Sequence, residues 1–162
     1  MFMRKLLLCL SFLFTPMMAL ATSYVAGDAI SPISLQDQND KAVSVTEQTK
    51  VVLFSRSMKG GDIIKETLTP LTGDKFPAHL VYVADISGMP SLIAKFVAVP
   101  QMQELPFAIG LDREGQISRL LPDSKDMATM ILLDNLNIQD IAYFDSSEAL
   151  GQALVKLNES QQ

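Results

Sequence analysis

The chain has 162 residues, with 18 acidic and 13 basic side chains and a formal net charge of −5. Its hydrophobic fraction of 48% is enough for the core of one domain. An acidic chain without clustered Lys and Arg is poorly suited to nucleic acid or to an anionic membrane surface, so we expect neither as a partner.

The first 21 residues have the pattern of a secretory signal peptide. Arg4 and Lys5 precede an apolar run over residues 6–14, and Ala-Leu-Ala at 19–21 supplies the small residues that a signal peptidase accepts. The apolar stretch is shorter than the roughly 20 residues that span a bilayer. We therefore expect cleavage after Ala21, a periplasmic or secreted protein without a membrane span, and a single domain over residues 22–162.

Cysteine usage limits the chemistry of that domain. Cys9, the only cysteine, lies in the predicted signal, so cleavage would leave no thiol for a redox dithiol, a thiolate zinc site or a nucleophile. Cleavage also removes Arg4 and Lys5 and no acid, which moves the formal charge from −5 to −7. Since His79 is the only histidine, we predict no metal and no cofactor.

The first half of the domain reads as a hairpin, a strand and a helix. Short alternating runs at 33–36 and 42–46 flank a polar turn and predict the hairpin. The continuous apolar run at 50–55 is typical of a strand buried on both faces. Two glycines follow, after which Asp62 is expected to cap a helix that Pro70 ends early.

The middle of the chain repeats this alternation. Residues 79–86 predict a second buried strand, and Pro90 suits the first position of the next helix. The spacing of Leu92, Phe96 and Val99 predicts the apolar face of that helix. A short extended piece at 106–111 follows.

The C-terminal part predicts a hairpin and a helix. Residues 130–133 and 138–144 flank a polar turn, as two paired strands would. Asp145 with Glu148 resembles a capping box for the last helix. Its apolar residues recur with helical spacing, at Leu150, Ala153, Leu154 and Leu157. Alternation followed by a terminal antiparallel pair predicts an α/β sandwich with a mixed sheet.

Four stretches in this order resemble the thioredoxin-like superfamily, in the branch of peroxiredoxins and ResA/TlpA-type periplasmic oxidoreductases. Gly27-Asp28-Ala29-Ile30 with SLQDQNDKAVSV resembles the entry hairpin, and KVVLFSRSMKGGDIIKETL resembles the strand, active-site loop and first helix. LPFAIGLDREGQISRLL and MATMILLDNLNIQDIAYFDSSEALGQAL resemble the segments that follow. The resemblance implies a three-layer sandwich with a mixed central sheet and an N-terminal β-hairpin.

The chain departs from this superfamily at the active site. The resemblance places the two cysteines of the CxxC motif at Lys59 and Asp62, and the cis-proline near Met127-Ala128. None of these positions carries the family residue, so the resemblance implies a redox-inactive member with a trans peptide there. Among its relatives the chain is most similar to YtfJ-type periplasmic proteins, which keep the fold without the dithiol.

The leading hypothesis is therefore that the chain binds a peptide or protein of the cell envelope. Members of the superfamily grip extended chains by backbone pairing next to the cis-proline, a mode that needs no cysteine. The candidate binding residues line the vacated site: Met58, Lys59, Gly60, Gly61, Asp62, Met127 and Ala128.

Two alternatives stay open. An oxidoreductase of thioredoxin or peroxiredoxin type could use residues other than cysteine. A small anion could instead bind at the Gly60-Gly61 helix start, where the helix dipole and Lys59 favour negative charge.

Overall fold

The computed structural model describes residues 22–71 and 75–160, so the predicted signal at 1–21 lies outside the described residues. A seven-stranded mixed sheet forms the centre, in the order β2-β1-β5-β4-β3-β6-β7. The strands are β1 (Ile33–Gln36), β2 (Ala42–Val45), β3 (Val51–Ser55), β4 (Leu80–Asp85), β5 (Gly110–Asp112), β6 (Ala128–Asp134) and β7 (Asn137–Phe144). The mixed sheet and the N-terminal β1–β2 hairpin are as predicted.

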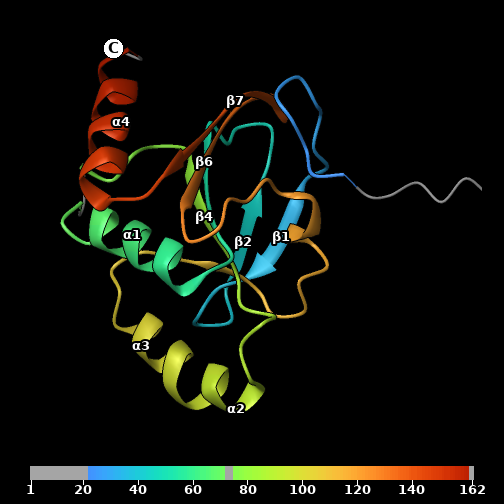
Figure 1. Cartoon of the computed structure of the whole chain (residues 1–162), viewed down its shortest axis with the longest axis vertical. Helices are drawn as coiled ribbons and strands as arrows, with labels where there is room; N and C mark the ends of the chain where they lie inside the picture. The colour runs from blue at the N-terminus through green and yellow to red at the C-terminus, as the bar shows by residue number, and fades with distance from the viewer. Residues whose placement is uncertain (1–21, 72–74, 161–162) are drawn as a thin grey trace, which may run out of the picture.

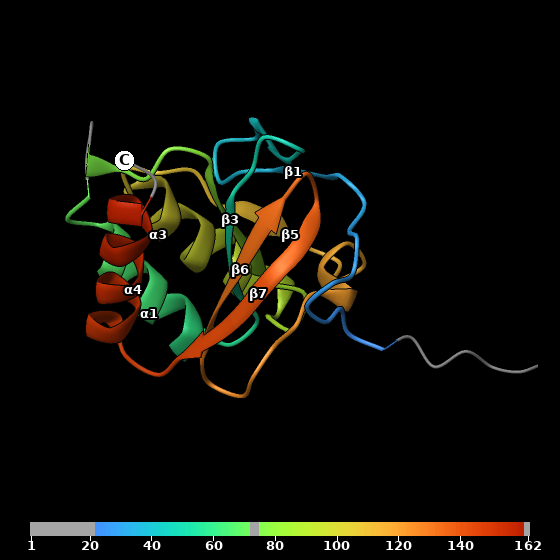
Figure 2. The same cartoon turned by 90° about the horizontal axis from the view of Figure 1, so that it is seen from above.

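The helical elements cover the sheet unequally. They are α1 (Met58–Leu68), α2 (Ser91–Ile93), the π-helix η2 (Ala94–Ala98), α3 (Val99–Gln103), the 3-10 turn η3 (Ser118–Leu120) and α4 (Ser147–Ser160). Helices α1 and α4 lie on one face, and the N-terminal segment and η3 lie on the other (Figures 1 and 2). The second outer layer is therefore made mostly of extended chain.

The central strands form as their sequences predict. All five residues of β3 are buried, as a run that packs on both faces requires. β3 pairs in parallel with β4, and antiparallel with β6 on its other side. The parallel pair β3–β4 places the carboxyl ends of both strands at one end of the sheet, and the elements that follow them begin there.

Each face of the sheet has its own apolar core. The α1–α4 side includes Ile64 and Leu68 of α1 with Leu150 and Leu154 of α4. This confirms the predicted apolar face of the last helix. The opposite side holds Val52, Phe54 and Ile131 of the central strands, closed by Ile30 and Leu121.

The predicted capping residue of α4 is wrong. The helix begins at Ser147, and the N–H of Ala149 donates to the Oγ of Ser146 at 3.4 Å. The cap is thus one residue later than Asp145. Pro90 likewise caps α2 instead of taking its first helical position, because its ψ of 133° is not helical.

Candidate functional site

The start of α1 is built around Ser57. This residue has extended backbone angles, and its side-chain oxygen accepts the N–H of Gly60 at 3.1 Å. Ser57 is therefore the N-cap, and the prediction that Asp62 caps the helix is wrong. Asp62 lies in the second turn, where its carboxylate pairs with Lys65 at 2.6 Å. The Gly-Gly pair, read from the sequence as a break before the helix, is inside its first turn.

Two of the candidate segments meet at Gly60. A Cβ added to Gly60 would lie 2.3 Å from the carbonyl oxygen of Met127, so only glycine fits at this contact. The helix start and the segment before β6 are thus in direct backbone contact. The structure brings together the regions that the resemblance placed in one site, although they are far apart in sequence.

The candidate residues differ widely in exposure. Met58, Lys59 and Asp62 are exposed, and Met127 is half-buried. The remaining three are buried: Gly60, Gly61 and Ala128. Only Met58, Lys59, Asp62 and the half-buried Met127 can therefore touch a partner without rearrangement.

The backbone beside Ala128 is already engaged. The peptide bonds of the described ranges are all trans, including the one between Met127 and Ala128. The N–H of Met127 donates to the carbonyl of Ser124 at 3.1 Å, while its carbonyl packs on Gly60. A partner strand pairing with Met127 would have to displace these contacts.

A buried hydroxyl pair lies beneath the helix start. The hydroxyls of Ser55 and Tyr82 are 2.8 Å apart, below Gly61. Burial raises the pKa of Tyr82 to about 12; the bond with Ser55 lowers it in part, and the charge of Asp62 adds to the rise. Tyr82 is therefore a neutral hydrogen-bonding group at ordinary pH.

An ion-pair network that the sequence analysis missed adjoins this end of the sheet. The Nε of Arg56 donates to Asp85 at 3.0 Å, its Nη2 donates to the Ser118 carbonyl at 2.9 Å, and its Nη1 lies 3.8 Å from Asp123. The guanidinium also stacks 5.2 Å from the ring centre of Phe54. Arg56 directly follows β3 and Asp85 is the last residue of β4, and these positions at the ends of the two buried strands were the available signal.

The two acids of this network have opposite pKa shifts. Burial pushes the pKa of Asp85 upward, but hydrogen bonds from Ser87 and the charge of Arg56 outweigh it and lower the pKa. Burial raises the pKa of Asp123, against the attraction of Arg56 and with the help of the Asp85 charge. Arg56 therefore pairs mainly with Asp85, and its hydrogen bond to the Ser118 carbonyl links η3 to the end of β3.

The helical segment 91–103 differs from the predicted amphipathic helix. The sequence predicts that Leu92, Phe96 and Val99 form one apolar face, but Leu92 is 69% exposed and Phe96 66% exposed, so that face does not pack on the core as a unit. Val99 does pack against the core. The π-helix η2 contains Phe96 and ends just before Val99, and its wider i→i+5 spacing breaks the 3.6-residue register on which the prediction rested.

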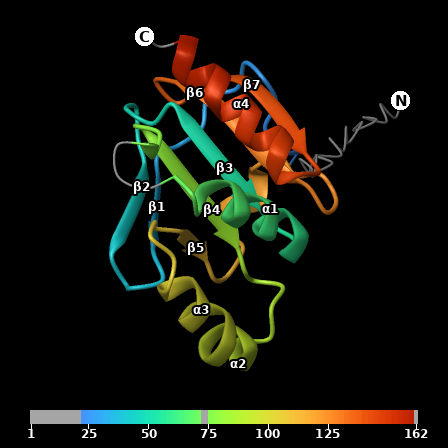
Figure 3. The same cartoon turned by 90° about the vertical axis from the view of Figure 1, so that its left-hand side faces the viewer.

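Five exposed apolar side chains lie on the two elements at this end of the molecule, α1 and segment 91–103. We call them the apolar end surface: Met58, Leu92, Ile93, Phe96 and Val97. Both contributing elements follow the carboxyl ends of parallel neighbours, α1 after β3 and α2 after β4. Figure 3 shows α2 beyond the arrowhead of β4, while α1 crosses in front of the strands.

Within 22–71 and 75–160, no three acidic, histidine or cysteine side chains are grouped as metal ligands would be. No helix in those ranges is both long enough and apolar enough to cross a membrane.

Comparison with solved structures defines the fold as thioredoxin-like. A protein of Chlorobium tepidum assigned as the thiol:disulfide interchange protein DsbE is similar, with a TM-score of 0.55 and 23% identity, over 83% of this chain and 98% of that one. StoA from Bacillus subtilis is similar with a TM-score of 0.53 and 14% identity, over 77% and 98% of the two chains.

The peroxiredoxin side of the resemblance has a structural counterpart as well. A peroxiredoxin-like protein from Aquifex aeolicus gives a TM-score of 0.52 at 9% identity, over 83% of this chain and 88% of that one. No protein-family model and no curated protein sequence matches the chain. At these identities the similarity concerns the fold alone.

Proposed function

We propose that this chain is an envelope protein that works by binding, without thiol chemistry, and that it holds an apolar segment of a partner protein or peptide. The leading support is the apolar end surface. Met58 is 78% exposed, more than any other large hydrophobic residue in the described ranges. Apolar side chains gathered at one place on a protein surface commonly mark an interaction site.

Lack of a thiol in residues 22–162 supports the redox-inactive part of the proposal. The positions that resemble the dithiol carry Lys59 and Asp62, whose side chains do not exchange electrons. Two of the solved structures named above are described as a thiol:disulfide interchange protein and a peroxiredoxin-like protein. The proposal is that the present chain keeps their fold and uses the same end of the sheet for contact only.

The contact is proposed to be made by side chains. Backbone pairing next to Met127 would break its bond to Ser124, whereas Met58 and Phe96 reach solvent without any change. Methionine suits such a surface because its flexible thioether adapts to apolar partners of different shape. A π-turn within segment 91–103 also fits, since such turns are frequent at functional sites.

A peptide-binding assay tests the contact surface. Apolar extended peptides selected on the purified protein would be titrated against Met58→Ser and Phe96→Ser, and we expect each variant to bind at least about tenfold more weakly, a loss of roughly 1.4 kcal/mol. Val155→Ser is the matched control, because Val155 is 56% exposed but lies on α4. If Val155→Ser weakened peptide binding equally, or if neither Met58→Ser nor Phe96→Ser weakened it, the apolar end surface would not be the binding site.

Enzyme assays test the redox part separately. Insulin reduction and peroxide consumption by the purified protein, at equal concentrations of this chain and of a CxxC thioredoxin, should give buffer-level rates for this chain. Turnover above buffer would favour the oxidoreductase alternative. That outcome would leave the peptide measurements standing, so the two parts of the proposal fail independently.

A further inference from the structure

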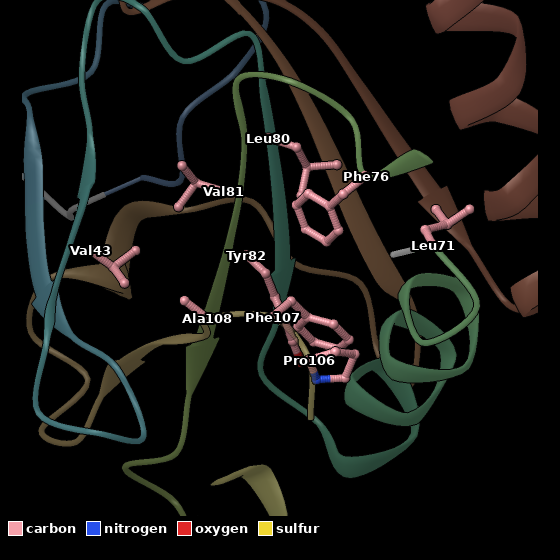
Figure 4. A pocket seen from close by; sticks show the side chains of 9 residues that line it. All are labelled: Val43, Leu71, Phe76, Leu80, Val81, Tyr82, Pro106, Phe107 and Ala108. Carbon is pink, nitrogen blue, oxygen red and sulfur yellow. The ribbon is translucent and has the colours of Figure 1, made fainter. Parts of the chain in front are cut away.

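A separate cavity of about 230 Å³ lies beside the first half of β4. Its walls come from β2, β4, the end of the α1 region and residues 106–108: Val43, Leu71, Phe76, Leu80, Val81, Tyr82, Pro106, Phe107 and Ala108. All nine belong to the described residues, and none carries a charge. Figure 4 shows the rings of Phe76, Tyr82 and Phe107 among these side chains.

The cavity has a buried floor and an exposed rim. Leu80, Tyr82 and Phe107 are buried, while Pro106 and Ala108 are exposed. The ring of Phe107 stacks with that of Phe76, with 6.2 Å between the centroids and 27° between the planes. A ligand entering past Ala108 would therefore meet aromatic and aliphatic walls.

Gln38 anchors the segment that forms one wall of the cavity. Its buried side-chain amide donates to the Phe107 carbonyl at 2.7 Å and accepts the N–H of Ile109 at 2.9 Å. These bonds hold the segment on the side away from β4. The β4–β5 ladder begins only at Val83 with Gly110, so residues 106–109 are not paired with β4.

Part of the β4 edge consequently faces the cavity. No backbone hydrogen bond joins residues 80–82 to 106–109, all of which the structure describes. Successive residues of a parallel strand direct their N–H and C=O to alternate sides. At least one residue among 80–82 thus presents a donor and an acceptor on the cavity side. The apolar walls of the cavity surround these groups.

We propose that this cavity binds a small neutral aromatic molecule that carries one hydrogen-bonding group, such as a phenol or an indole. An apolar cavity of about 150 Å³ suffices to bind benzene, so 230 Å³ admits a substituted ring. Uncharged walls disfavour an ionic ligand, because nothing there would replace its hydration. The free β4 backbone supplies the partner for the ligand's single polar group.

Tyr82 connects this cavity with the start of α1. Tyr82 lines the cavity, and its hydroxyl bonds to Ser55 beneath Gly61. A ligand against the ring would change the surroundings of Ser55 and Gly61 without touching them. Binding in the cavity should therefore be detectable at Ser55 and Gly61, which do not line it.

Titration of indole and of p-cresol into the isotope-labelled protein, followed by amide NMR, tests the proposal. We expect saturable shifts at Leu80 and Ala108, with smaller shifts at Gly61. Ala108→Leu and Val43→Phe fill the cavity from its two sides and should weaken binding at least about tenfold. Ala26→Leu, at an exposed position in the N-terminal segment, is the control and should bind as the unchanged protein does.

Two results would overturn the proposal. The first is the absence of saturable shifts for both probes up to their solubility. The second is unchanged affinity in Ala108→Leu, a variant at an exposed position that is expected to fold, as circular dichroism would verify. If Val43→Phe does not fold, Ala108→Leu alone decides the question.

Discussion

The start of α1 and the helical segment 91–103 occupy the same end of the sheet but are built in opposite ways. In α1, six of eleven residues are buried, including both glycines. In α2, η2 and α3 no residue is buried, although the segment is rich in apolar side chains. α1 follows the carboxyl end of β3, and segment 91–103 follows that of its parallel neighbour β4. Their location in the fold therefore does not explain the difference in burial.

The two segments therefore have different roles: the start of α1 supports the fold, and segment 91–103 offers side chains for contact with a partner. The α1 start is closed by a glycine on a backbone carbonyl and by a buried hydroxyl pair, which leaves little that can move. Segment 91–103 leaves Leu92 and Phe96 in solvent, where they stabilise the fold little. Substitutions in the first region should therefore lower the free energy of unfolding, and substitutions in the second should change binding.

The largest effect is expected for Gly60→Ala. Its new Cβ would meet the Met127 carbonyl at 2.3 Å, and a backbone atom cannot swing away as a side chain can. Overpacking of this kind costs about 1–3 kcal/mol, and we expect the upper end after allowing for alanine's better helix propensity. Urea denaturation of the variant measures the loss.

Gly61→Ala is the matched control for that substitution. Its Cβ would lie 3.4 Å from the Tyr82 hydroxyl and 3.6 Å from that of Ser55, ordinary contact distances. We expect a change within about 1 kcal/mol, of either sign, since helix propensity favours alanine. Equal losses at both glycines would mean that the Met127 contact is not what closes the site.

The buried Tyr82 should make stability fall in strong base. Its pKa is about 12 in the folded protein and near 10 in the unfolded chain, so between these values the folded state holds a proton that the unfolded state has lost. The free energy of unfolding should thus decrease from about pH 10 to pH 12, by roughly 2–3 kcal/mol for two pKa units. Denaturation midpoints across this pH range give the measurement.

Tyr82→Phe tests the origin of that slope. The variant lacks the ionisable group, so the part of the decline due to Tyr82 should vanish. At neutral pH the same variant should lose about 1–2 kcal/mol, because the Ser55 hydroxyl loses its partner in a buried position. A decline above pH 10 identical to that of the unchanged protein would assign the slope to other groups.

Ser57→Ala should cost about 1 kcal/mol, the usual effect of removing a helix N-cap. Asp62→Ala is the comparison, since Asp62 pairs only with Lys65 on the exposed side of the helix and should change stability by less than about 0.5 kcal/mol. Thermal unfolding of both variants decides between the two capping residues. A larger loss at Asp62 would restore the cap that the sequence pattern favoured.

The sequence predicted those parts of the fold whose signal is local. Strands β3 and β4 are continuous apolar runs, and their burial follows from composition alone. The last helix shows its buried side as a regular repeat, and Leu150 and Leu154 are indeed buried. Positions of the chain reversals were also predicted, because polar turn residues separate the strands.

Features that depend on contacts between distant segments could not be predicted in this way. The helix is capped by Ser57, ahead of both glycines, and Gly60 lies inside it where the Met127 backbone approaches too closely for any side chain. Leu92 and Phe96 have the spacing of a buried face, but periodicity does not say what a face packs against. The grip of Gln38 on residues 107–109 left no local pattern at all.

The smallest effect on stability is expected for Phe96→Ser. Two-thirds of this side chain is already in solvent, and substitutions at such surface positions usually change the free energy of unfolding by less than about 0.5 kcal/mol. The nearby ammonium of Lys95, 5.5 Å from the ring, adds little at an exposed site. Chemical denaturation should therefore barely distinguish the variant from the unchanged protein, while its peptide affinity falls. A loss of several kcal/mol would show that Phe96 is packed in solution, in which case segment 91–103 supports the fold as α1 does and the apolar end surface has no free side chains to offer a partner.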